Sequence, residues 1–381
     1  MKVAHIIAGL NVGGAELMLR RLVLQHGTTF GGQHLVISLT DVGTIGKQLA
    51  EDGVMVLGLG LRQPASAPIV LYRLYRLLKR TQPDVVQTWM YHADLLGGVT
   101  ARLAGIRTVI WGIRSTDIRK GGSPVTRLVR WACARVSRYI PRSIVCAAEE
   151  SRRVHLALGY HPNAMTVIPN GFDFPALQAK PHEAEDVRRG LGLEAGTVLV
   201  GTVGRFNRVK GIDIFVTAAG LIAAKHPGVH FLLAGRGMDF KNPVLASLIA
   251  ATGCAERFHL LGERDDVPAC LSALDVYCMP SRSEGFPNVV GEAMAVGTPC
   301  VVTRVGDAAC LIGEHGFVVA PEKPTALAEG LLRMLELPSN MRREMGRAAQ
   351  ERLRDEFSMV KCASGFDRVY REAICHGEKT R

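Results

Sequence analysis

The chain has 381 residues, of which 48% are hydrophobic and 21% charged, a length and balance that predict two globular domains. No apolar run approaches the roughly 18 residues of a membrane span, so we expect no transmembrane helix. The formal net charge of +11 lies entirely in the first half, because residues 1–190 hold 24 lysines and arginines against 13 acidic residues, whereas residues 191–381 hold 22 of each. We therefore expect an anionic surface or polyanion as a partner of the first half only.

The chain shows no sign of export. Its opening segment, residues 1–10, is too short in its apolar part for a signal peptide. The nine cysteines are scattered and form no C-x-x-C pair. We expect a cytoplasmic protein with reduced thiols.

Short β-rich segments alternate with helical segments in the first half, the pattern of an α/β fold. The expected strands are Val3–Ala8, His34–Leu39, Met55–Leu59, Val85–Thr88, Thr108–Ile113 and Ser143–Ala147. The expected helices are Glu16–His26, Ile45–Glu51, Ile69–Arg80, Leu95–Ala104 and Val125–Arg138.

A glycine loop follows the first strand and opens the first helix. Gly13 and Gly14 let the backbone approach a bulky group, and the free N–H groups of the helix start favour an anion such as a diphosphate. A plain strand-to-helix turn without a ligand explains this loop equally well. The glycines do not match the G-x-G-x-x-G fingerprint, which weighs against a nicotinamide dinucleotide.

The segment Ile168–Gly171 is a turn, and the stretch that follows it to Pro181 is irregular, so we place the linker there. The domains expected are 1–172, 173–356 and a closing helix in 357–381. The second series of strands is Val198–Thr202, His230–Ala234, Phe258–Leu261, Val276–Met279, Pro299–Thr303 and Gly316–Val319. Helices Asn340–Glu356 and Met359–Ile374 follow it.

A cationic loop opens the second domain. Arg205 and Lys210 lie five residues apart between glycines, after the strand Val198–Thr202. Two cations at the carboxyl end of a strand can hold a diphosphate between them. A solvated basic loop is the alternative.

A pair of glutamates lies further on, with Glu284 in a loop and Glu292 eight residues later. Pro287 suits a first helical position, which would put Glu292 about a turn and a half into the helix. The loop thus offers a carboxylate for sugar hydroxyls and backbone N–H groups for phosphate, from Gly285, Phe286, Pro287 and Asn288. A nucleotide-sugar carries both kinds of group.

At this point the chain resembles glycosyltransferase family 4, a retaining family with the GT-B fold. The resemblance rests on the paired glutamates, the Gly13–Gly14 loop, the segment Gly204–Gly211 and the turn Ile168–Asp173. It implies an α/β fold of two Rossmann-like domains facing each other across a cleft, with the last helix crossing back to the first domain.

The resemblance also implies roles for individual residues. Glu284 would hold the donor sugar, Glu292 the ribose, and Arg205 and Lys210 the diphosphate. Gly14 would add a backbone N–H, and Asn288 and its neighbours would contact sugar and phosphate.

One departure concerns the acceptor side of the site. Many members carry a histidine after the fourth or fifth strand of the first domain, where this chain has Arg114 in the stretch 111–117. His92 occurs earlier, and it either faces the acceptor as a catalytic group or caps a helix.

The function these features favour is transfer of a sugar from a nucleotide-sugar, with UDP as the expected nucleotide, by a hexosyltransferase. The acceptor expected is lipid-linked or a polysaccharide, in cell-surface glycan biosynthesis. Arg205 and Lys210 would stabilise the leaving diphosphate. No Asp-x-Asp motif is present, so we expect no cofactor and no metal. Retention by same-face attack, with the leaving phosphate taking the acceptor's proton, is implied by the resemblance alone.

Three alternatives remain open at this stage. A UDP-sugar 2-epimerase shares the fold but is expected to carry a different carboxylate and histidine set. An oxidoreductase lacks its fingerprint here, and a nucleic-acid binder is suggested only by the basic half, without a recognisable motif.

Basic residues also suggest peripheral contact with the inner face of the cytoplasmic membrane. Between Arg102 and Arg153 there are 12 basic and 3 acidic residues. On a helix over Pro124–Ile140, one face would carry Trp131 among four arginines, with apolar residues opposite. The arginines of that face are Arg127, Arg130, Arg135 and Arg138, and a second basic stripe is Arg73, Arg76, Lys79 and Arg80. Two ordinary solvated faces are the alternative.

Overall fold

The computed structural model describes residues 1–116 and 123–378 and divides into two compact units. Unit 1 comprises Met1–Gly171 and Met359–Arg381, and unit 2 comprises Phe172–Ser358. The domain boundaries expected from the sequence, after residues 172 and 356, lie within two residues of the observed boundaries after Gly171 and Ser358. Part of the expected basic stretch, residues 117–122, lies outside the described residues.

Unit 1 is built on a seven-stranded parallel sheet in the order β3-β2-β1-β4-β5-β6-β7. The first strand lies inside the sheet, where Ile7 pairs with Ser38 on one side and Trp89 on the other. This is a doubly wound order, in which the chain reverses direction next to β1. The strands are β1 Lys2–Ile7, β2 Gln33–Ser38, β3 Met55–Gly58, β4 Val85–Trp89, β5 Val109–Ile113, β6 Ser143–Cys146 and β7 Met165–Val167.

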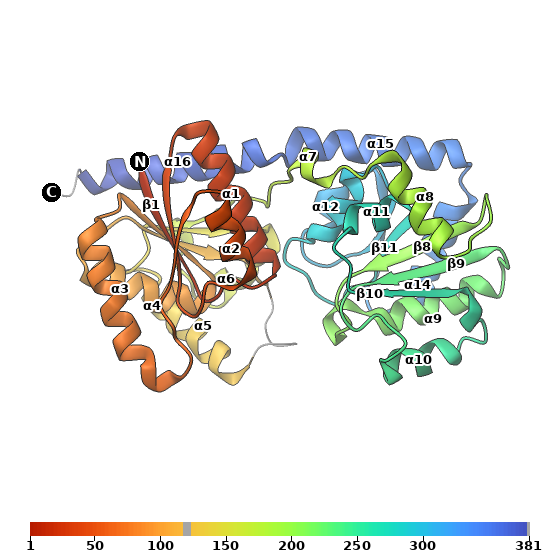
Figure 1. The fold of residues 1–381 in the computed structure, drawn as a ribbon, viewed down its shortest axis with the longest axis horizontal. Coiled ribbons are helices and arrows are strands. Elements are labelled where there is room, and N and C mark those ends of the chain that lie inside the picture. The colour runs from red at the N-terminus through yellow and green to blue at the C-terminus, as the bar shows by residue number, and fades with distance from the viewer. Residues whose placement is uncertain (117–122, 379–381) are drawn as a thin grey trace. The chain divides into compact units, whose positions relative to one another are not determined.

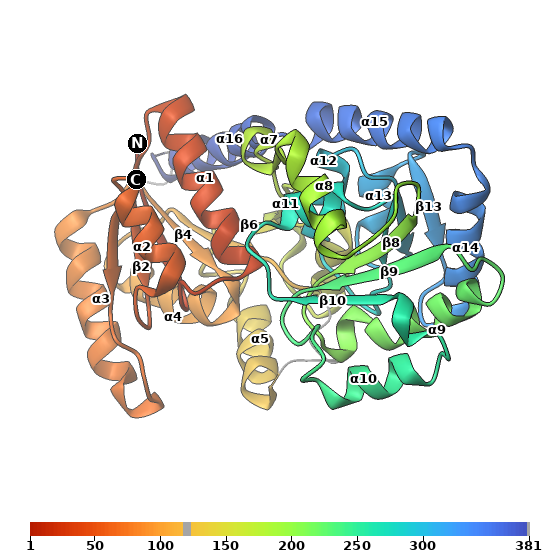
Figure 2. The same ribbon diagram turned by 45° about the vertical axis from the view of Figure 1, so that its right-hand side comes forward.

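Helices cover both faces of this sheet, which explains why the residues of β4 and β5 are all buried. Helices α3, α4 and α5 lie over one face and α1, α2 and α16 over the other (Figure 2). The helices are α1 Gly14–Phe30, α2 Gly43–Glu51, α3 Ala67–Thr81, α4 Met90–Leu103, α5 Pro124–Val136, α6 Glu149–Ala157 and α16 Met359–Glu378.

The last helix belongs to unit 1, although the chain reaches it only after unit 2 (Figure 1). It packs along α1, and its Phe366 and Tyr370 are fully buried in the same core as Met18 and Leu22 of α1. The C-terminal helix therefore crosses back to the first domain, as the resemblance to the family implies.

Unit 2 repeats the architecture with a six-stranded parallel sheet in the order β10-β9-β8-β11-β12-β13. The central pair is β8 with β11, where Val200 lies opposite Val276. The strands are β8 Val198–Val203, β9 Val229–Ala234, β10 Phe258–Gly262, β11 Val276–Met279, β12 Cys300–Thr303 and β13 Gly316–Val319.

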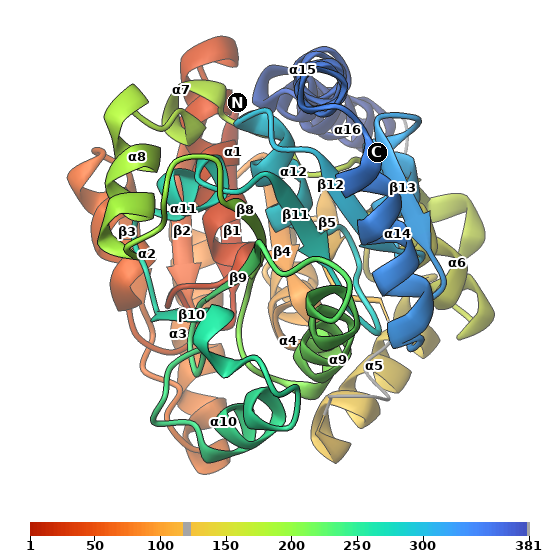
Figure 3. The ribbon, with the colours of Figure 1, turned by 90° about the vertical axis from the view of Figure 1, so that its right-hand side faces the viewer.

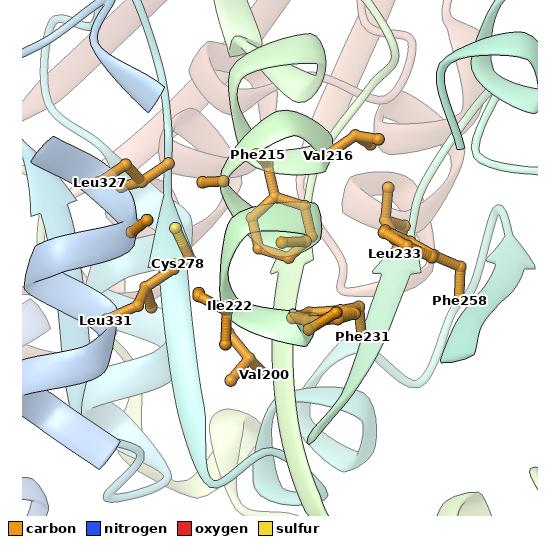
Figure 4. Packing of buried hydrophobic residues seen from close by; sticks show 14 of the residues in the cluster. Val200, Phe215, Val216, Ile222, Phe231, Leu233, Phe258, Cys278, Leu327 and Leu331 are labelled. Carbon is orange, nitrogen blue, oxygen red and sulfur yellow. The ribbon is translucent and has the colours of Figure 1, made fainter. Parts of the chain in front are cut away.

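The helices of unit 2 again form two layers, with α9, α10 and α14 over one face and α11, α12 and α15 over the other (Figure 3). Phe215 and Ile222 of α9 pack onto Phe231 of β9, and Leu327 and Leu331 of α14 close the same core (Figure 4). The helices are α7 Phe174–Leu177, α8 Pro181–Gly190, α9 Ile212–Ala223, α10 Pro243–Ala250, α11 Val267–Ser272, α12 Asn288–Ala295, α13 Ala308–Ile312, α14 Pro324–Glu336 and α15 Ser339–Glu356.

Two expectations about unit 1 were incomplete. Helix α4 begins at Met90, five residues before the expected Leu95, because Met90 adopts a φ of +67° directly after β4 and turns the chain into the helix at once. Helix α6 and strand β7 were not predicted from the sequence. Strand β7 has three half-buried residues, and α6 has only nine residues and starts with Glu149 and Glu150.

No helix in the described residues is long and apolar enough to span a bilayer.

Candidate functional site

The predicted site residues lie where strands of the two sheets end. All strands in each unit are parallel, so their carboxyl ends and the loops after them gather along one edge of each sheet. In unit 2 this edge brings together the loop after β8, with Lys210, and the loop after β11, with Glu284.

The cationic loop is held in a defined conformation. The Asn207 side chain accepts a hydrogen bond from the Lys210 backbone N–H at 3.0 Å and caps the short 3-10 helix Arg208–Lys210. Gly211 then takes a φ of +65°, and a Cβ there would collide with the carbonyl of Pro280. This glycine is therefore required for the loop to lie against the end of β11. Arg205 is exposed.

The two loops meet in an ion pair. The Nζ of Lys210 lies 2.6 Å from Oε1 of Glu284, and the Ser281 hydroxyl donates to the same oxygen at 2.7 Å. Both side chains are largely shielded, at 27% and 12% exposed. They line a cavity of about 10 Å³ with Thr202 and Tyr277, room for no more than a single water.

A second ion pair, between Arg282 and Asp213, also connects the loop after β11 to the segment that follows β8. The Arg282 guanidinium donates to Asp213 at the start of α9 (2.8 Å) and to the carbonyl of Arg208 (2.8 Å). The hydrogen bonds from Arg282 hold the pKa of the Asp213 carboxyl below its usual range. Neither residue was predicted to have a role. They lie 69 positions apart in the sequence, so no local sequence pattern indicates that they pair.

Helix α12 carries the remaining donor-side predictions. Pro287 is the residue before the helix and not its first residue, because α12 begins at Asn288; this corrects the expected position by one. Glu292 lies half-buried on the helix. The Phe286 ring packs against Phe172 and Phe357 within unit 2, with centroids 6.2 and 5.9 Å apart, so only its backbone is available to a ligand.

In unit 1 the glycine loop leads directly into α1. Gly13 is the extended residue before the helix and Gly14 its first residue. A Cβ on Gly13 would collide with the carboxylate of Glu16. The loop thus presents the start of a 17-residue helix at the carboxyl edge of β1.

His92 lies at the same edge, in the first turn of α4. It is half-buried, and this burial lowers its pKa, which keeps the imidazole neutral near pH 7. A neutral imidazole can accept a proton.

Arg114 is half-buried and braces unit 1. Its guanidinium lies 4.6 Å from the ring centre of Trp89 and 5.4 Å from that of Phe366 on α16, and it donates to the Asn170 side chain at 3.0 Å. Burial lowers the Arg114 pKa and raises the pKa of nearby Asp94 to about 8. Arg114 therefore ties β5 to the linker and to α16.

The arginine face expected on residues 124–140 is only partly present. Arg130 is 7% exposed, and its carbonyl accepts a hydrogen bond from Tyr160, so it does not belong to an exposed basic face. The helix also ends at Val136, four residues before the Ile140 expected from the sequence. Arg127, Arg135 and Arg138 are exposed, and Trp131 lies beside Arg135, with its ring centre 5.0 Å from the guanidinium. The prediction that Arg130 shares this face is wrong because the helix turns it inward.

No cluster of three or more His, Cys, Asp or Glu side chains suited to a metal ion occurs in residues 1–116 and 123–378. What the unit 2 site can do follows from its side chains. It offers two cations, a carboxylate and a helix start, which suits a ligand with phosphate and hydroxyl groups.

The fold and this site define a two-domain α/β enzyme of the GT-B type. Residues 12–174 match the family model described as Glycosyltransferase Family 4, and residues 197–337 match the one described as Glycosyl transferases group 1. The chain belongs to glycosyltransferase family 4 and is a glycosyltransferase.

Two curated relatives illustrate the similarity. The 2-deoxystreptamine glucosyltransferase of Streptomyces kanamyceticus is 30% identical over 338 residues, 84% of this chain and 85% of that protein. The UDP-Gal:alpha-D-GlcNAc-diphosphoundecaprenol alpha-1,3-galactosyltransferase of Escherichia coli is 26% identical over 310 residues, 80% and 79% of the two chains.

A solved structure agrees in fold. HepE from Anabaena, crystallised with UDP, superimposes with a TM-score of 0.85 at 22% identity and covers 98% of this chain and all of its own.

Proposed function

We propose that this glycosyltransferase moves a hexose from a UDP-sugar to a lipid-linked or polysaccharide acceptor, with retention of configuration, in cell-surface glycan biosynthesis. HepE, which shares the fold, was crystallised with UDP and with UDP-glucose. The Escherichia coli relative is named for a UDP-galactose donor and a diphosphoundecaprenol acceptor. These names support a UDP-sugar and a lipid-linked acceptor.

The observation that carries the donor assignment is the contact between Lys210 and Glu284. An ammonium group has three donors, and Lys210 spends one on Glu284. Both hydrogen bonds to Glu284 fall on Oε1, which leaves Oε2 for a sugar hydroxyl among the contacts of the described residues. A single pair of side chains can thus hold a diphosphate and the sugar next to it.

The chemistry assigned to the cations is stabilisation of the leaving group. The sugar carbon gains positive character as the diphosphate departs, and fixed positive groups stabilise that charge separation. Lys210 is already fixed by Glu284 and the Asn207 cap, and Arg205 is exposed on the same loop. Glu292 would bind the ribose, and Gly14 would add a backbone N–H. The reaction would then need no metal.

Unit 1 is the proposed acceptor side. Neutral His92 at the carboxyl edge can accept a hydrogen bond from an acceptor hydroxyl. Exposed cations on α3 and α5, with Trp131 on α5, suit peripheral contact with anionic lipids. The location we propose is therefore peripheral, on the inner face of the cytoplasmic membrane.

Product analysis tests this proposal. The full-length protein would be incubated with a panel of UDP- and GDP-sugars and a membrane lipid extract, and both pools would be analysed by mass spectrometry. We expect one UDP-sugar to yield UDP and a glycosylated lipid. An isomerised nucleotide-sugar formed without any acceptor would instead support the 2-epimerase alternative.

A further inference from the structure

An apolar groove lies between α3 and α4 of unit 1, outside the donor site. It encloses about 500 Å³, within the range of small-molecule sites. Seven of its eight lining residues are leucine, valine or tyrosine. The lining residues are Leu71, Tyr72, Tyr75, Leu95, Leu96, Val99, Thr100 and Leu103.

The groove is exposed to solvent at its rim. Tyr72 is 61% exposed and Leu103 71%, although both carry large, mainly apolar side chains. Contiguous exposed apolar surface of this kind commonly marks a binding site.

The exposed charges of the two helices that form the groove are all positive. Helices α3 and α4 carry five exposed basic side chains, whereas their single carboxylate, Asp94, is buried and accepts hydrogen bonds from Thr88 and Gly112. Nζ of Lys79 lies 4.0 Å from the place where Gly105 would carry a Cβ, at the end of α4 beyond Leu103. The other four basic residues are Arg73, Arg76, Arg80 and Arg102.

The groove also leads to the proposed acceptor edge. His92, Leu95, Leu96, Val99 and Leu103 follow i, i+3, i+4, i+7 and i+11 spacing, so they form one stripe along α4. From Leu95 to Leu103 the stripe is about 12 Å long, at about 1.5 Å per residue. The end of the groove next to Leu95 is therefore one helical turn from His92.

We propose that this groove binds the hydrocarbon chain of the lipid-linked acceptor, with the phosphate end toward His92 and the rim cations on the headgroups of the surrounding anionic lipids. This inference rests on the proposed function and adds the place where the acceptor's lipid is recognised. An apolar lining on two helices whose exposed charges are positive matches a hydrocarbon chain that enters the groove from an anionic membrane surface.

Photolabelling with a polyprenyl phosphate tests the groove directly. The probe is a C20 isoprenoid phosphate with a benzophenone at its chain end, added to the full-length protein in detergent, irradiated and mapped by peptide mass spectrometry. We expect adducts on residues 67–81 and 90–103, with competition by undecaprenyl phosphate. Adducts elsewhere would overturn the proposal, and equal competition by phosphatidylglycerol would assign the groove to bulk lipid instead of the acceptor.

Surface variants provide the matched controls. Tyr72→Glu and Leu103→Glu should each lower labelling at least about tenfold, whereas Val360→Glu on α16, a half-exposed apolar residue outside the groove, should leave it unchanged. Undiminished labelling in both groove variants would contradict the proposal. If sedimentation shows a wild-type dimer that Tyr72→Glu dissociates, the groove is an interface between two copies and the proposal is wrong.

Calorimetry with UDP on the same proteins separates this inference from the proposed function. All variants should bind UDP as the wild type does, because the groove lies in unit 1 and the donor loops in unit 2. UDP binding without groove labelling would refute the groove alone. Groove labelling without binding of UDP or any UDP-sugar would refute the donor assignment.

Discussion

Two side chains that are 74 positions apart in sequence define the donor site at the residue scale. Lys210 and Glu284 form an ion pair beside a small cavity, and the Ser281 hydroxyl donates to the same carboxylate oxygen. Because the pair is shielded from solvent, removal of one charge leaves the other in an unfavourable environment. Lys210 and Glu284 should therefore contribute to donor binding together, so that the loss of either one also weakens the contribution of the other.

The first prediction concerns the carboxylate. Glu284→Gln keeps the shape of the side chain but removes the charge that holds Lys210 and the sugar hydroxyls. We expect sugar transfer to fall by about 10²–10³, a typical loss for one preorganised electrostatic contact. Initial rates would be measured together with thermal unfolding. Turnover close to wild type in a folded variant would remove Glu284 from the donor site.

The second prediction concerns the cations and the metal. Arg205→Ala combined with Lys210→Ala should reduce turnover by several orders of magnitude, at about 10²–10³ for each lost group. EDTA should leave wild-type turnover unchanged. An enzyme that EDTA silences and magnesium restores would contradict the metal-free mechanism.

At the scale of elements, a chain of three histidines, of which His5 and His26 are buried and His34 is half-buried, connects the sheet of unit 1 to α16. The Trp89 indole can only donate, so it donates to Nδ1 of His5 at 3.2 Å. Nε2–H of His5 then donates to Nδ1 of His34 (3.0 Å), and Nε2–H of His34 to Nδ1 of His26 (3.1 Å). Nε2 of His26 lies 3.3 Å from the Asp367 carboxylate on α16. This arrangement requires all three imidazoles to be neutral.

The third prediction is a loss of stability in acid. Burial lowers the pKa of all three histidines, that of His34 to about 4, below the value of about 6.5 in the unfolded chain. The unfolded state therefore binds more protons between pH 6.5 and about 4. The stabilisation is complete above pH 6.5 and is lost as the pH falls through that window.

Thermal unfolding across this pH range measures the effect. His34→Gln, which can still accept and donate within the chain, should give a shallower fall of Tm than the wild type. His182→Gln, at an exposed position on α8, is the control. Equal slopes for wild type and His34→Gln would show that the histidine chain does not govern acid stability.

The sequence predicted the regular elements well and the interactions between them poorly. Twelve of the thirteen strands in the described residues follow from short β-rich runs, whereas β7 has only three half-buried residues and no such pattern. Glu284 and Lys210 were both found by their motifs, but their direct contact was not, because it depends on the adjacency of β8 and β11. The inward turn of Arg130 likewise depends on tertiary packing, which helical periodicity does not determine.

At the scale of the whole molecule, the charge asymmetry between the two halves of the chain suggests a role in membrane binding, separate from catalysis. The excess of positive charge lies in the first 190 residues, and exposed apolar side chains accompany it on α5, at Val125, Leu128 and Trp131. Cations next to exposed aromatic and aliphatic groups are typical of helices that lie in a membrane interface.

The fourth prediction is salt-sensitive binding to anionic vesicles. Replacing Arg127, Arg135 and Arg138 with glutamine should weaken binding by roughly 100-fold, at about 1 kcal/mol for each charge near the surface. Arg130 is left unchanged because it is buried. Sedimentation with anionic and neutral vesicles provides the measurement.

The control for this experiment removes the same charge from unit 2. A triple glutamine variant at Arg189, Arg343 and Arg347, all exposed, should bind vesicles as the wild type does. An equal loss in both triple variants would mean that net charge alone governs binding. Equal binding of the wild type to anionic and neutral vesicles would contradict the membrane proposal.

Hydrogen–deuterium exchange with and without UDP measures whether the loops after β8 and β11 bind the donor's diphosphate. We predict slower exchange in peptides that cover residues 204–211 and 281–295, and no such protection in the Arg205→Ala, Lys210→Ala double variant. Protection by UDP that falls elsewhere in the chain, or that persists unchanged in the double variant, would show that these loops do not bind the diphosphate.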